Sequence, residues 1–128
     1  MQILGIDYGT KRIGVAISDQ NREFAMPLVV IPNSKEAINK VKKICKDNEI
    51  SEIVIGESRN YKGEPNAIFD EVEIFKKELE LKKFTVYLEP EFMTSVEAER
   101  IQGKNDMSDA SAAALILQAY LDKTKDIK

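Results

Sequence analysis

Along the first part of the chain, hydrophobic positions follow the two-residue period of strands. Two runs rich in β-branched residues, ILGID and RIGVAIS, flank a turn that contains Gly9, which predicts a β-hairpin. A third strand is expected directly afterwards, and Pro27 within it indicates a sheet edge or a bulge. Two later β-branched segments predict further strands. The three predicted strands after the hairpin cover residues 23–32, 50–57 and 84–89.

The remaining segments have apolar residues every three or four positions, which predicts amphipathic helices. Two of the predicted starts have the spacing of a capping box, in which a glutamate follows three residues after a polar cap. A proline suits the first turn of another helix, and a serine is the expected cap of the last one. The predicted starts are Asn33 with Glu36, Pro65, Thr94 with Glu97, and Ser108. The predicted apolar face of the last helix consists of Ala112, Ala113, Ile116, Leu117 and Tyr120.

The order of these elements predicts an α/β fold. Three strands with short connections should pair antiparallel, and the two later strands, which are reached through helices, should be parallel by right-handed crossovers. We therefore expect a five-stranded mixed sheet flanked by helices. The chain has 128 residues without repeats or a linker, so one domain over 1–128 is expected, with the last residues frayed.

Composition narrows the possible chemistry. The chain is 43% hydrophobic and 32% charged, has a net charge of −3, and contains no apolar run near the ~18 residues of a membrane span. We expect a soluble cytoplasmic protein without a signal peptide or a membrane partner. Its single cysteine, Cys45, lies in a helical apolar stripe and is interpreted as a core residue. Histidine is absent, which excludes histidine-based triads, bases and metal sites.

Carboxylates gather at the predicted ends of three strands. Strands one, four and five should share one carboxyl edge, where ligands bind in open α/β sheets. Each acid alone also fits an ordinary turn, surface or helix-start role, but their shared edge favours a metal site. Without a cation such acids repel one another, whereas Mg²⁺ or Mn²⁺ binds oxygen ligands and activates water. The acids are Asp7, Glu57, Glu89 and Glu91 at strand ends, and Asp109 in the first turn of the last helix.

Three motifs resemble the YqgF/RuvX family over essentially the whole chain. They are GIDYGTKRIGVAISD near the start, TSVEAERI in the middle and DASAAALILQAYL near the end. The resemblance implies an RNase H-like fold, related to RuvC-type resolvases, and a metal-dependent nuclease. It also implies one of two roles: maturation of the 5′ end of pre-16S rRNA in ribosome biogenesis, or resolution of Holliday junctions.

The resemblance also assigns roles to individual residues. Asp7 matches the family's strand-one acid, Asp109 its last-helix acid, and Lys11 and Arg12 its basic pair, which are expected to contact phosphates.

The middle acid departs from the family pattern. The family commonly has Asp-Glu-Arg where this chain has Pro90-Glu91-Phe92, so only Glu91 is kept. Strand four ends with Glu57, where RuvC-type resolvases carry a carboxylate. Our hypothesis is that Asp7, Glu57 and Asp109 hold the metal, with Glu91 or Glu89 in support.

The segment SRNYKGEPN, residues 58–66, is expected to be a loop beside Glu57. Arg59 and Lys62 would grip a nucleic-acid backbone while Tyr61 stacks on a base. A solvated loop without such a role is an equally good interpretation.

Two other classes of function stay open. Asp-x-Gly-Thr also resembles the phosphate loop of ATPases of the actin, heat-shock chaperone and sugar kinase type, but those need two such domains. A non-catalytic nucleic-acid-binding relic is the other alternative. Symmetric junction cleavage requires a two-fold dimer, whereas RNA processing does not. A monomer or a homodimer is possible, and we favour pre-16S rRNA, within ribosomal precursor particles, over branched DNA.

Overall fold

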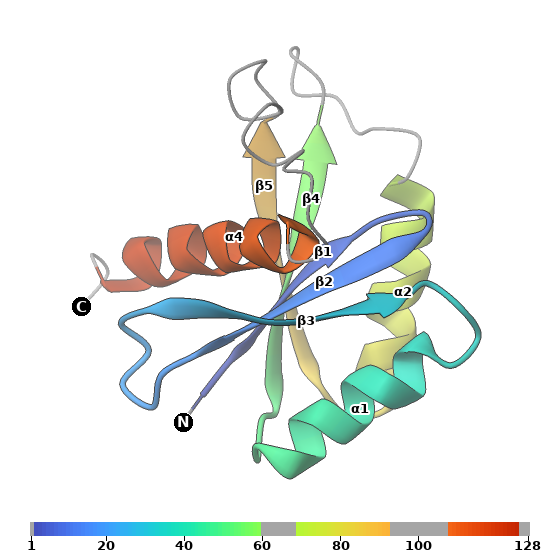
Figure 1. Cartoon of the computed structure of the whole chain (residues 1–128), viewed down its shortest axis with the longest axis horizontal. Helices are drawn as coiled ribbons and strands as arrows, with labels where there is room; N and C mark the ends of the chain where they lie inside the picture. Colours follow the sequence, from blue (N-terminus) through green and yellow to red (C-terminus); the bar gives the residue numbers. More distant parts are fainter. Residues whose placement is uncertain (1, 60–68, 93–107, 126–128) are drawn as a thin grey trace.

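The computed structural model describes residues 2–59, 69–92 and 108–125 (Figure 1). Several predictions fall outside these residues and are not tested by it. They are the helix start at Pro65, the helix that begins at Thr94, the side chains of Tyr61 and Lys62, and the fraying of the last residues.

The described strands form one five-stranded sheet in the order β3-β2-β1-β4-β5. The first three strands pair antiparallel, and β1 pairs with β4, and β4 with β5, in parallel. The predicted mixed sheet is therefore confirmed. The bounds are β1 Leu4–Tyr8, β2 Arg12–Ser18, β3 Ala25–Pro32, β4 Glu52–Arg59 and β5 Thr85–Phe92.

The prediction that Pro27 marks a sheet edge or a bulge is confirmed. Pro27 lies in β3, an outer strand of the sheet, and the pairing of β3 with β2 shifts register between Val15 and Ala16. Proline lacks a backbone N–H, so an edge strand with an irregular register accommodates it without losing a buried hydrogen bond.

The two parallel strands β4 and β5 run past their predicted ends. Glu89 and Glu91 therefore lie inside β5 rather than after it, and Arg59 belongs to β4 rather than to a loop. The pairing continues residue by residue, so that Ser58 pairs with Glu91 and Arg59 with Phe92. The prediction from composition ends both strands too early, because pairing with the partner strand, rather than local β propensity, stabilises their last residues.

The described helices cover both faces of the sheet. Their bounds are α1 Ala37–Asp47, α2 Phe69–Leu81 and α4 Ser108–Lys125. Figure 1 shows α4 lying across one face of the sheet, away from α1 and α2. Within the described residues, none of these helices is long and apolar enough to cross a membrane.

The hydrophobic core is divided by the sheet into two clusters. One packs α1 and α2, including Cys45, against Leu4 and Ile6 of β1. The other packs α4 against Ala16 and Val54. Cys45 is fully buried, and burial raises the pKa of its thiol to about 12, which confirms that it is a core residue. The predicted apolar face of the last helix is confirmed: Ala112, Ala113, Ile116 and Leu117 are buried, and Tyr120 is partly buried.

Candidate active site

The hairpin that carries Asp7 closes through a turn with no room for a side chain at Gly9. A Cβ there would lie 2.5 Å from the carbonyl oxygen of Arg12, which is far inside van der Waals contact. Asp7 is the fourth residue of β1 and pairs with Gly14 of β2. The predicted hairpin is confirmed, with Asp7 near its tip.

The start of α4 reaches the sheet because Gly14 also lacks a side chain. A Cβ on Gly14 would lie 1.9 Å from the carbonyl oxygen of Asp109, so the helix backbone rests directly on β2. Paired residues of neighbouring strands share a face of the sheet, which places Asp7 on the face that α4 covers. Gly14 thereby brings together the two acids at opposite ends of the chain.

The electrostatics of Asp7 reflect this enclosure. Burial, followed by the negative charge of Asp109, raises the pKa of the Asp7 carboxyl from 3.8 to about 6. Both effects disfavour the ionised form in the absence of a cation. Asp109 has a partner of its own, since its Oδ2 lies 2.9 Å from Nε of Arg12. Among the side chains that the structure describes, the site thus contains two carboxylates and one guanidinium.

These residues fit a divalent cation by their chemistry. Two carboxylates that repel each other present hard oxygen donors, which Mg²⁺ and Mn²⁺ prefer. Within the described residues, however, no group of three His, Cys, Asp or Glu side chains is arranged to hold a metal ion. Glu57 and Glu91, the expected further ligands, have backbones at the carboxyl ends of β4 and β5, and their side chains lie outside the described part of the chain.

Glu89 has a different role from the one expected. It is 6% exposed, and its carboxylate lies 3.0 Å from Nζ of Lys123 near the end of α4. Lys123 and Asp109 are fourteen residues apart on α4, or about 21 Å along the helix axis. The structure therefore ties Glu89 to the opposite end of α4, where a lysine compensates its charge.

The other predicted binding residues are only partly described. Lys11 is exposed in the hairpin turn, and Arg12 is 59% exposed while it contacts Asp109. Arg59 is placed by its backbone alone, and Tyr61 and Lys62 lie outside the described residues. Of the predicted basic set, Arg12 is the residue seen at the acids.

One residue of this region has a role that the sequence pattern obscures. Asn33 was expected to cap a helix, but α1 begins at Ala37 and its N-cap, Glu36, makes no side-chain cap hydrogen bond. Instead, Asn33 Nδ2 donates to the carbonyl oxygen of Gly9 at 2.8 Å, and its backbone N–H donates to that of Lys11 at 3.0 Å. The capping prediction is wrong, because Asn33 forms its hydrogen bonds with the hairpin turn and not with the start of α1.

A family model described as "RuvX: Holliday junction resolvase" matches residues 1–123 of the chain. The chain belongs to the RuvX family. A relative from Protochlamydia amoebophila named "Putative pre-16S rRNA nuclease" is 34% identical and covers 94% of this chain and 93% of its own length. One of the same name from Endomicrobium trichonymphae is 36% identical and covers 98% of both chains.

Two solved structures share the fold of this RuvX-family chain. A fowlpox virus Holliday junction resolvase aligns with a TM-score of 0.57 at 15% identity, covering 97% of this chain and 99% of its own. Thermus thermophilus RuvC, in complex with a Holliday junction substrate, aligns with a TM-score of 0.54 at 14% identity and covers 98% and 96%. The predicted RNase H-like fold and the family are confirmed, and family membership supports the predicted nuclease activity.

Proposed function

We propose that this protein is a divalent-metal-dependent nuclease that hydrolyses phosphodiester bonds of precursor 16S rRNA in the cytoplasm. The observation that carries the proposal is that Asp7 and Asp109 lie close enough to repel each other. Burial and the negative charge of Asp109 raise the pKa of Asp7 to about 6. Such a pair lowers the stability of the free protein and is relieved by a cation. The names of the relatives support precursor rRNA as the substrate.

Asp7 and Asp109 are the residues that would hold the metal. Glu91, whose register matches the α4 side, and Glu57, the ligand hypothesised from the sequence, are the two candidates for the third ligand. Mg²⁺ or Mn²⁺, when bound, lowers the pKa of water and stabilises charge on the scissile phosphate. The chain itself contributes orientation: Asp7 is enclosed by the sheet and α4, and Asp109 is held by the contact of its backbone with Gly14.

Arg12 links the acids to the substrate. Its ion pair with Asp109 is partly exposed, and exposed pairs of this kind contribute about 0.2–1 kcal/mol. The guanidinium can therefore leave Asp109 at small cost and bind a phosphate oxygen instead, where two parallel hydrogen bonds are possible. Lys11 adds a second cation at the exposed turn. Arg59, Lys62 and Tyr61 would extend this contact along the nucleic acid.

A four-way DNA junction is the second candidate substrate. The description of the family model favours it, and cleavage of a symmetric junction requires two active sites and hence a homodimer. Processing of rRNA within a ribosomal precursor particle needs one site, which a monomer provides.

Cleavage of two substrates side by side tests the proposal. Purified protein is incubated with Mg²⁺ or Mn²⁺ and either a pre-16S 5′-leader RNA or a four-way DNA junction, with Asp7→Asn as the control. Cleavage of the RNA alone, abolished in the variant, is the expected result. Paired symmetric nicks in the junction alone would make the protein a resolvase. If a protein that demonstrably binds metal cuts neither substrate, the proposal is overturned in favour of a non-catalytic binding role.

A further inference from the structure

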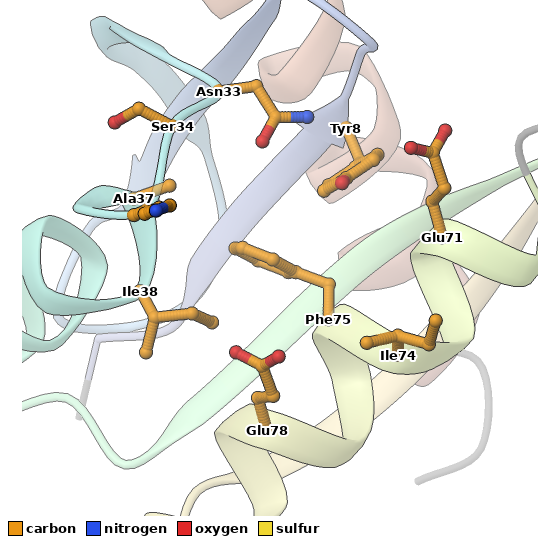
Figure 2. A pocket seen from close by; sticks show the side chains of 10 residues that line it. Tyr8, Asn33, Ser34, Ala37, Ile38, Glu71, Ile74, Phe75 and Glu78 are labelled. Carbon is orange, nitrogen blue, oxygen red and sulfur yellow. The ribbon is translucent and has the colours of Figure 1, made fainter.

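A pocket of about 410 Å³ lies between α1 and α2, on the face of the sheet opposite to α4 (Figure 2). A volume of this size is typical of sites for small molecules. Residues of β1, of the segment that joins β3 to α1, of the first turn of α1, and of α2 form its walls. They are Tyr8, Asn33, Ser34, Lys35, Ala37, Ile38, Glu71, Ile74, Phe75 and Glu78.

Consecutive residues of β1 contribute to the candidate active site and to the pocket. Tyr8 directly follows Asp7 in β1, and successive side chains of a strand point to opposite faces of the sheet. Tyr8 therefore lines the pocket while Asp7 lies under α4. Asn33, which also lines the pocket, donates to Gly9 of the hairpin turn at 2.8 Å. A nucleic-acid strand that crosses the turn would pass both sites.

The inner wall of the pocket offers a surface for a flat ring. The rings of Tyr8 and Phe75 are in contact, with centroids 5.0 Å apart and planes tilted by 57°. Phe75 is buried, with 6% exposed, so the ring that a base can reach is that of the partly buried Tyr8. Figure 2 shows Ile74 next to Phe75 on α2, and 59% of Ile74 is exposed. Aromatic and aliphatic surface of this kind stabilises a nucleobase by stacking, whichever base it is.

The polar groups divide the pocket into two ends of different charge. Glu71 and Glu78 extend from α2, and their carboxylates accept hydrogen bonds but cannot donate them. The segment that joins β3 to α1 contributes the cation of Lys35 to the lining. A nucleotide would fit with its base amino group toward α2 and its phosphate toward Lys35.

We propose that this pocket binds one nucleotide of the substrate strand, beside the position of cleavage, and prefers bases with an exocyclic amino group. The proposal rests on the proposed nuclease function for the identity of its ligand. Cytosine presents such an amino group where uracil presents a carbonyl oxygen, and carboxylates accept from the cytosine amino group. The carbonyl of uracil would face the carboxylates without a hydrogen bond.

Titration with cytidine and uridine monophosphates tests the pocket apart from cleavage. Amide NMR spectra of the metal-free protein, kept in EDTA, are recorded with each nucleotide. We expect shifts at Tyr8, Ile74 and Phe75, and an affinity for the cytidine nucleotide about three- to tenfold higher than for the uridine one. Equal affinities, or shifts confined to other regions, would overturn the proposal.

Variants of α2 assign the preference to the two carboxylates. Glu71→Ala and Glu78→Ala together are expected to equalise the two affinities. Glu73→Ala and Glu80→Ala together are the matched control, because they remove the same two charges from α2 but do not line the pocket. The amide spectrum of each variant shows that it is folded. A cytidine preference that survives in the double variant contradicts the proposal.

The two proposals can fail separately. If wild-type protein cuts neither RNA nor DNA and still prefers the cytidine nucleotide, the nuclease proposal fails and the nucleotide site stands. If it cuts RNA but does not discriminate between the two nucleotides, the pocket proposal alone fails.

Discussion

Nε of Arg12 lies 2.9 Å from Oδ2 of Asp109, so the hairpin supplies a cation to the acid at the start of α4. Asp7, which shares the site, has its pKa raised to about 6 by burial and by the charge of Asp109. In the free protein, Arg12 thus compensates the charge of Asp109, one of the two carboxylates described at this site. This arrangement determines how each residue should respond to substitution.

Replacing Arg12 should separate metal binding from nucleic-acid binding. Arg12→Ala removes a cation that competes for Asp109, so we expect Mn²⁺ to bind about two- to fivefold more tightly, as measured by calorimetry without nucleic acid. The same variant should bind an RNA oligonucleotide in EDTA more weakly, because a phosphate contact is lost. Lys11→Ala is the control, with weaker RNA binding and unchanged Mn²⁺ affinity. Weaker Mn²⁺ binding in Arg12→Ala would contradict this interpretation.

Stability should depend on pH through Asp7. Its pKa is higher in the folded chain, about 6 against 3.8, so between these values the folded state binds more protons than the unfolded state. The contribution of Asp7 to stability therefore falls as pH rises from about 4 to about 6 and stays low above. Asp7→Asn should be more stable than wild type at pH 7.5 by about 2 kcal/mol and similar to it below pH 4.

Urea unfolding at both pH values measures this difference. Saturating Mg²⁺ should raise the stability of the wild type at pH 7.5 and leave that of Asp7→Asn nearly unchanged. If the wild type is the more stable of the two at pH 7.5 without metal, the raised pKa of Asp7 is not a property of the folded protein.

The identity of the third metal ligand can be decided by a matched pair of variants. Glu57→Gln and Glu91→Gln each keep the size of the side chain but remove its charge. Glu57 stands two residues after Ile55, which packs on the side of α1 and α2, whereas Glu91 stands two residues after Glu89, on the side of α4. Because Asp7 also lies on the α4 side, we expect Glu91→Gln to weaken Mn²⁺ binding by about tenfold or more and Glu57→Gln to weaken it less. Glu89→Gln is the control, since Lys123 holds that carboxylate near the other end of α4. A loss confined to Glu57→Gln would make Glu57 the ligand, as hypothesised from the sequence.

The hydrogen bond from Asn33 to Gly9 should matter for substrate binding as well as for stability. Asn33→Ala removes the Nδ2 donor from the hairpin turn, so we expect a loss of about 1 kcal/mol in unfolding free energy and weaker RNA binding in EDTA. Asn48→Ala is the control, because it removes an equivalent bond, from Asn48 Nδ2 to the carbonyl oxygen of Ile44 at 2.8 Å, at the end of α1 and outside the pocket. Unchanged RNA affinity in Asn33→Ala would mean that the turn keeps its shape without this bond.

Much of the architecture could be predicted because it depends on neighbours in the chain. The alternation of residues around Gly9 indicates the hairpin, and the spacing from Ala112 to Tyr120 indicates the buried face of α4. The positions of Asp7 and Asp109, one near a strand end and one at a helix start, follow from the same local patterns. The sequence by itself therefore determined which of the described strands and helices form and where these two acids stand in them.

Contacts between distant parts of the chain decided the rest. Parallel pairing extends β4 and β5 beyond their β-branched cores, and Asn33 binds the turn instead of capping α1. Glu89 pairs with Lys123, and Arg12 pairs with Asp109. Only the tertiary structure decides which partner a polar group has and how readily it ionises. Both depend on burial and on the nearest opposite charge, which come from residues that lie far away in the sequence.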